Sequence, residues 1–243
     1  MAKAVLNQDE DAQSDNLTES WAQEINLDEG LDFSYPAKKG KLKVAVSDEG
    51  ARIKITENNG PMLKEELISL GVENPQEKID NIFDYMDADS EARGTNPDSE
   101  ENAKNQELSA LEELMYAANI TKEDYGKMKD SLTIFGEDDK ININTVLKAW
   151  LEALLDFLLN QGKIDASDKE AVLTLRFGAD LIEGSADDGF YASDDDLLPA
   201  LKDNFRATSA IFRIFSQAEV GGIEKKITCV FDRKNGKVLY WQE

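Results

Sequence analysis

The sequence contains no histidine among its 243 residues, and Cys229 is its only cysteine. The lack of an imidazole excludes histidine acid–base catalysis, histidine-dependent serine or cysteine triads and histidine-ligated metals. A single thiol cannot form an internal disulfide, and it provides no CxxC pair for a soft metal. The chemistry open to this chain therefore depends on carboxylates and other oxygen ligands, or on binding alone.

Long hydrophobic runs are missing as well. The most apolar stretch, AWLEALLDFLL at 149–159, is interrupted by Glu152 and Asp156. It is also shorter than the roughly 20 residues that a membrane-spanning helix needs. No signal peptide is visible after Met1, because the sequence runs straight into polar residues. Hydrophobic residues make up 41% of the chain, so we expect a folded soluble protein or a soluble part of a longer one.

Basic residues are scarce, with 27 Lys and Arg against 50 Asp and Glu, which gives a net charge of −23. The charge is unevenly distributed: residues 1–60 carry −5, residues 61–200 carry −21 and residues 201–243 carry +3. Nucleic acid is excluded as a partner, because phosphate binding requires a basic face. The strongly acidic middle between near-neutral ends indicates a module inserted into a separate scaffold.

Strand patterns occur at both ends of the chain. Leu42, Val44 and Val46 alternate with their neighbours, and the pattern predicts a hairpin in which residues 53–56 return across a turn at 48–50. The segment AIFRIFSQAEV alternates in the same way. ITCVFDRKNGKVLYWQE predicts a second hairpin, since Asn-Gly is the strongest short hairpin signal.

Helical patterns fill the middle of the chain. Ile79, Ile82, Phe83 and Met86 recur at the spacing of one helix face. Polar residues at helix-start spacing predict further helices. They are Ser109 with Glu112, Thr121 with Asp124, Asn144 or Thr145, and Ser167 with Glu170. Strands before and after a helical middle predict an α+β architecture, with sheet at 40–56 and 207–243.

The stretch FDYMDADSEARGTNP at 83–97 concentrates four acidic residues, Asp84, Asp87, Asp89 and Glu91. Three interpretations are open: a Ca²⁺ site, a pair of catalytic carboxylates, or the solvated end of a helix. An EF-hand counted from Asp87 fails, because its sixth position is alanine instead of glycine and its twelfth is aspartate instead of glutamate. Another oxygen-ligand Ca²⁺ site remains open, since clustered carboxylates relieve their repulsion by binding a cation.

The catalytic interpretation finds little support in the sequence. Glycosidases place two carboxyl groups across a cleft where aromatic rings stack on the sugar. Trp21, Trp150 and Trp241 all lie far from the acidic stretch, and Trp150 falls within an apolar helix pattern. Among 50 acidic residues, any chosen pair carries little information.

An ordered series of segments resembles the K-type minor pseudopilin of type II secretion systems (general secretion pathway protein K). The series comprises SWA (20–22), GKLKVAVSDEGARIKIT (40–56), IDNIFDYMDAD (79–89), NQELSALEELMYAANITKEDYGKMKDSLTIFG (105–136), KININT (140–145) and TSAIFRIFSQAEV (208–220). The closing strands are similar too, so the resemblance extends from about residue 20 to the end. Tyr85 stands where the family usually has Trp.

The resemblance implies a pseudopilin αβ scaffold with an antiparallel sheet, interrupted by a large inserted α-helical domain. The expected division is 1–57 for the first scaffold part, 58–204 for the insert and 205–243 for the closing strands. It also implies a hydrophobic N-terminal helix that precedes residue 1 and anchors a periplasmic ectodomain in the inner membrane.

The same resemblance implies a function without catalysis. Such a protein binds the I-type and J-type minor pseudopilins at the pseudopilus tip, initiates assembly and helps export folded proteins through the outer membrane. It further implies structural Ca²⁺ in the insert, which favours Asp84, Asp87, Asp89 and Glu91 as ligands. Whether the second acidic loop at 187–196 completes that site stays open. The alternatives are a minor subunit of a type IV pilus and, as the less favoured one, a secreted carboxylate-dependent hydrolase.

Overall fold

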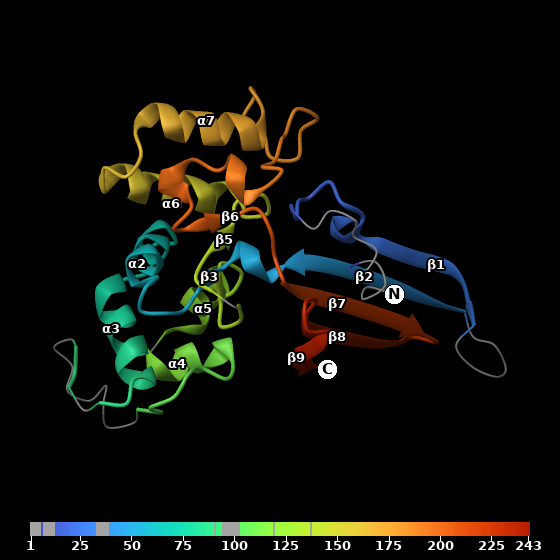
Figure 1. Ribbon diagram of the computed structural model, residues 1–243. Coiled ribbons are helices and arrows are strands. Elements are labelled where there is room, and N and C mark those ends of the chain that lie inside the picture. The colour runs from blue at the N-terminus through green and yellow to red at the C-terminus, as the bar shows by residue number, and fades with distance from the viewer. Residues whose placement is uncertain are drawn as a thin grey trace.

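The computed structural model describes residues 6, 13–32, 39–89, 91–93, 103–118, 120–136 and 138–243, with the side chains of 27–39 left outside the description. An antiparallel sheet lies on one side and a group of helices on the other (Figure 1). The chain enters the sheet, leaves it for the helices and returns to finish the sheet. The predicted α+β class is therefore confirmed.

Five strands form the sheet in the order β1-β2-β7-β8-β9, and each neighbouring pair is antiparallel. The strands are β1 (Ile25–Asp32), β2 (Lys39–Asp48), β7 (Ile211–Val220), β8 (Ile223–Asp232) and β9 (Lys237–Gln242). The central pair β2–β7 joins residues from opposite ends of the chain, with Val44 opposite Ser216. The helical middle is thus looped out between two adjacent strands.

One face of the sheet is apolar. Phe212 and Phe231 are opposite each other in the β7–β8 register and pack with Leu6 and Trp21 in one buried cluster. The Trp21 ring meets Phe212 edge-on, with 5.1 Å between the ring centroids. Aromatic pairs prefer this arrangement, because a positive ring edge then faces a negative ring face. This cluster fixes the N-terminal segment to the sheet.

The hairpin predicted within residues 40–56 is wrong. After β2 the chain makes a short 3-10 turn, η2 (Glu49–Ala51), and Ile53 and Lys54 form β3 beside Leu132 and Thr133 of β4. The side of β2 that a hairpin would occupy is taken by β7. Ile53 and Ile55 are buried in the core of the helical part, so their alternation reflects burial there.

The helical part has a separate large core and two small parallel strand pairs. Its helices are α2 (Gly60–Ser69), α3 (Pro75–Met86), α4 (Leu114–Ala117), α5 (Lys122–Met128), α6 (Lys148–Asn160) and α7 (Ala166–Phe177). The strand pairs are β3 with β4 (Leu132–Thr133), and β5 (Ile141–Asn142) with β6 (Phe205–Arg206). The division at 58–204 stays a prediction, and it is consistent with two distinct cores.

Of the helix starts predicted at α5, α6 and α7, the structure confirms only the one at α5. Thr121 caps α5 as predicted, with its hydroxyl accepting from the Asp124 N–H at 3.1 Å. At α7 the cap is Asp165 instead of Ser167. Asn144 and Thr145 cap no helix, because α6 begins after Leu147.

Before α4, the side chain of Glu113 instead of Glu112 receives the Ser109 and Ala110 N–H groups. Glu112 is thereby left for another role. In the described residues, no helix is long and apolar enough to cross a membrane.

Candidate functional site

The predicted metal-binding stretch begins on α3. Ile79, Ile82 and Phe83 turn into the core, as the spacing predicts, and the helix ends at Met86. Asp84 is fully buried on the same helix. A charged carboxylate at such a position requires donors or a cation, because burial removes its hydration.

Arg93 supplies that positive charge. Its backbone N–H donates to Asp84 at 3.1 Å, and its guanidinium donates to the Oδ2 of Asp87 at 2.6 Å. The same guanidinium pairs with Glu57. The hydrogen bond to Asp87 and the contact with Glu57 raise the pKa of Arg93 despite partial burial. The structure therefore gathers two of the four predicted ligands, Asp84 and Asp87, around an arginine of the same loop.

The other two predicted ligands form a small turn of their own. Asp89 accepts from the Glu91 N–H at 2.8 Å, and both side chains are exposed. Within the described residues, no group of three or more His, Cys, Asp or Glu is arranged to hold a metal. One atom does fit a cation: the Oδ1 of Asp87 is buried, and no described residue donates to it. Asp98, Glu100 and Glu101 lie outside the described residues, so Ca²⁺ binding stays a prediction.

The second acidic loop lies at the opposite end of the helical part, beyond α7 (Figure 1). Its carboxylates accept hydrogen bonds from neighbouring segments: Asp187 from the Ala179 N–H and the Ser185 hydroxyl, Asp188 from the Gly184 N–H, and Asp194 from the Ala207 N–H. This loop does not complete a site with Asp87.

A buried polar network joins the sheet to the helical part, and sequence reasoning did not find it. Asp48, the last residue of β2, is 5% exposed. Its carboxylate accepts from the Gly50 N–H at 2.7 Å, the Asn142 amide at 2.9 Å, the Thr145 hydroxyl at 2.5 Å and the Ser209 hydroxyl at 2.7 Å. Burial nevertheless raises the pKa of Asp48. Three segments of the chain meet at this side chain: 48–50, 142–145 and the approach to β7 at Ser209.

Two ion pairs flank Asp48. Arg213 forms a bidentate ion pair with the carboxylate of Glu49, with Nε and Nη2 each donating at 2.8 Å. The Thr133 hydroxyl donates to the same carboxylate at 2.7 Å. Although burial opposes it, Arg213 and the charge of Arg52 hold the pKa of Glu49 below its ordinary value. Bidentate arginine–carboxylate pairs of this kind fix geometry as well as charge.

Asp15, in the segment before β1, accepts from the Ser209 N–H at 2.6 Å and from Arg233 at 2.9 Å. Burial raises the pKa of Asp15 to about 6 and outweighs both of these contacts. The carboxylates of this junction are thus held by donors from β4, β5 and β7, from the turn after β8 and from the neighbouring loops. We interpret the junction as a clamp that sets the orientation of the helical part against the sheet.

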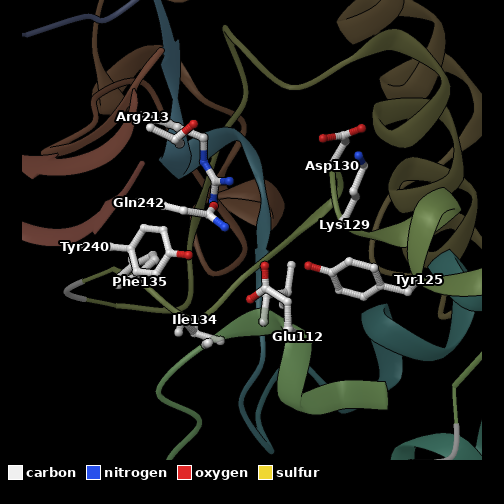
Figure 2. A pocket seen from close by; sticks show the side chains of 12 residues that line it. Glu112, Tyr125, Lys129, Asp130, Ile134, Phe135, Arg213, Tyr240 and Gln242 are labelled. Atoms are coloured by element: carbon white, nitrogen blue, oxygen red, sulfur yellow. The ribbon is translucent and has the colours of Figure 1, made fainter. Parts of the chain in front are cut away.

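A cleft of about 270 Å³ opens between the two parts of the molecule, close to this clamp (Figure 2). Arg213 and Tyr240 line it from the sheet, while Glu112, Tyr125 and Phe135 line it from the helical part. Arg213 contributes to both features, since it pairs with Glu49 and also borders the cleft.

Comparison with known proteins identifies the fold. No protein-family model and no curated protein matches the sequence. Among solved structures, the chain matches a chain of the GspK-GspI-GspJ complex from the type 2 secretion system of enterotoxigenic Escherichia coli. The match has a TM-score of 0.61 and 19% identity, and it covers 99% of this chain and 89% of that chain. The molecule therefore shares its fold with a chain of this complex, as the ordered sequence segments predict.

Proposed function

We propose that this chain is the ectodomain of a K-type minor pseudopilin and works in type II secretion by binding other proteins, without catalysis. The observation that carries the proposal is the looped-out helical part between adjacent strands β2 and β7. This unusual chain path matches a component of the GspK-GspI-GspJ complex along nearly the whole length. The ordered segments at 20–22, 40–56, 79–89, 105–136 and 140–145 support the same assignment independently of the backbone.

The finer role follows from that assignment. The I-type and J-type minor pseudopilins are the proposed partners, and the pseudopilus tip in the periplasm is the proposed place. There the protein initiates assembly and helps to move folded proteins through the outer membrane. An N-terminal helix in the inner membrane completes the protein in this proposal. In this proposal the junction carboxylates are structural, because Asp48 and Glu49 accept hydrogen bonds from the fold itself.

The test is co-expression of this chain with the soluble parts of the I-type and J-type proteins from the same genome. We expect a stable ternary complex in light scattering after size exclusion. A type IV pilus role predicts instead that the chain binds minor pilins encoded beside it and ignores the secretion proteins. Failure to bind either secretion pseudopilin, with all three proteins folded, contradicts the proposal. Hydrolysis of a polysaccharide by the purified chain contradicts it as well.

Structural Ca²⁺ at Asp84, Asp87, Asp89 and Glu91 is part of the same proposal. It is supported by the buried, unpartnered Oδ1 of Asp87 and by the resemblance, whereas Arg93 already balances part of the charge. A ligand that binds only the folded state raises the melting temperature. We therefore expect Ca²⁺ to raise the melting temperature of EDTA-treated protein. Equal melting in EDTA and in millimolar Ca²⁺ removes this part of the proposal.

A further inference from the structure

The cleft between the sheet and the helical part has aromatic walls around a carboxylate. Phe135 and Tyr240 lie with ring centroids 6.2 Å apart at an angle of 50°. Figure 2 shows the hydroxyl groups of Tyr125 and Tyr240 pointing toward each other from opposite walls, with the carboxylate of Glu112 between them. The walls come from two different parts of the molecule, so the cleft exists only when the clamp holds them together.

Glu112 is half-buried, and it has no cation partner among the described residues. It makes a hydrogen bond with the hydroxyl of Tyr125, whose pKa rises to about 12 through burial, the charge of Glu112 and this hydrogen bond. Glu113, the next residue, differs in both respects, because it is paired with Lys104 at 2.8 Å and caps a helical turn. Glu112 thus has no described structural task that explains a carboxylate at this position.

The positive groups at the cleft, Arg213 and Lys129, form no ion pair with Glu112 in the described structure. Arg213 borders the cleft, but two of its three guanidinium nitrogens, Nε and Nη2, donate to Glu49 at 2.8 Å. Lys129 is exposed and lies beside Asp130 at the rim (Figure 2). The cleft is therefore lined by a carboxylate without an ion pair among the described residues and by the aromatic side chains of Tyr125, Phe135 and Tyr240.

We propose that this cleft receives a lysine or arginine side chain from a partner protein. Aromatic faces attract cations within about 6 Å, and the attraction is larger where water is displaced. A partly desolvated carboxylate is stabilised by an opposite charge more strongly than an exposed one. The volume of about 270 Å³ suits a single long side chain, and the net charge of −23 steers a basic surface toward this molecule. The inference rests on the proposed partner-binding function and names the chemistry that the partner must present.

The experiment is an NMR titration that follows the ring signals of Tyr125, Phe135 and Tyr240. The probes are Nα-acetyl-lysine methylamide, the arginine analogue and the uncharged norleucine analogue. We expect saturable shifts with both cationic probes, at least five-fold weaker affinity in Glu112→Gln, and no saturation with norleucine. Glu123→Gln is the matched control, because Glu123 is an exposed carboxylate in the same region, on α5. It should bind the probes like the unaltered protein.

Three results overturn the inference. They are an absence of saturable shifts, equal binding of the norleucine probe, and unchanged affinity in Glu112→Gln. A fourth is binding of putrescine more than ten-fold tighter than the lysine probe, because this identifies a site for free amines instead of protein side chains.

A second measurement separates this inference from the proposed function. Glu112→Lys should weaken the complex with the I-type and J-type proteins at least ten-fold, whereas Glu123→Lys should not. If the ternary complex forms and Glu112→Lys leaves its affinity unchanged, the cleft inference fails and the proposed function stands. If no complex forms but the cationic probes bind through Glu112, the proposed function fails instead.

Discussion

Replacement of Asn142 by alanine tests whether the junction is a clamp. The side-chain amide of Asn142, on β5, donates to the carbonyl of Asp15 at 3.0 Å, to Asp48 at 2.9 Å and to the Ser209 hydroxyl at 3.2 Å. Its carbonyl oxygen accepts from the Asn144 N–H at 3.0 Å. One buried side chain therefore connects the segment before β1, the end of β2, the approach to β7 and the helical part.

The expected loss of unfolding free energy follows from the hydrogen bonds that Asn142→Ala removes. A hydrogen bond to a carboxylate is worth about 2 kcal/mol, and a buried neutral group left without a partner costs about 1 kcal/mol or more. The amide has two protons for three acceptors, so two donated bonds and one accepted bond are lost. We therefore expect Asn142→Ala to lower the free energy of unfolding by about 4 kcal/mol, which is a large part of the stability of an ordinary domain.

Urea unfolding provides the assay, with circular dichroism at 222 nm reporting the helices and tryptophan fluorescence reporting Trp21 and Trp241 of the sheet part together with Trp150 of α6. The unaltered protein should show coincident transitions, which indicate one cooperative unit. In Asn142→Ala the sheet and the helical part should unfold at different urea concentrations. Asn26→Ala is the control, since the exposed Asn26 donates to the exposed Glu24, and its cost should stay below about 0.5 kcal/mol. A loss below about 1 kcal/mol in Asn142→Ala, with coincident transitions, refutes the clamp.

Two other predictions concern charge. The pKa of Asp15 rises from 3.8 to about 6 on folding, so its contribution to stability is fully present below pH 3.8 and is lost as the pH increases through 6. Asp15→Asn should therefore remove up to about 3 kcal/mol of the difference in unfolding free energy between pH 4 and pH 7. Urea titrations at the two pH values measure this difference. If it is the same in Asp15→Asn as in the unaltered protein, the raised pKa of Asp15 is contradicted. For the metal, Asp87→Ala and Asp89→Ala should each abolish the rise in melting temperature that Ca²⁺ causes. The control is Glu73→Gln, at an exposed site before α3, which should keep the rise. If calorimetry finds the rise intact in both alanine variants, Asp87 and Asp89 are excluded as ligands.

The sequence predicts those elements whose signal is local. The β8–β9 hairpin depends on a turn of neighbouring residues, and Asp232 accepts from the Asn235 N–H at 2.9 Å to fix that turn. The pairing of β2 with β7 has no local signal, because its partners lie on either side of the whole helical part. The hairpin predicted at 40–56 fails for this reason: alternation reports which side chains are buried and does not identify the strand that lies alongside.

The junction was missed for a different reason. Asparagine and threonine are common caps, so KININT predicts a helix start. In the structure, Ile141 and Ile143 are buried on one side, and Asn142 and Asn144 are fully buried on the other. Alternation of isoleucine with asparagine was visible in the sequence, and it would have indicated a strand. That the polar side is also buried depends on Asp48 and Ser209, which only the tertiary structure brings together.

The carboxylates of the clamp and of the cleft differ in the number of hydrogen-bond donors that contact them. Asp48 and Glu49 are fully buried, and each oxygen of Glu49 is met by a hydrogen-bond donor, so a ligand could reach them only by breaking the fold. Glu112 is half-buried, has one hydroxyl contact and faces an open cleft. Glu112 has no ion pair among the described residues, and a cation that enters the cleft would provide one. In a chain with 50 acidic residues, this deficit of donors, more than acidity itself, distinguishes Glu112 as a carboxylate suited to recognition.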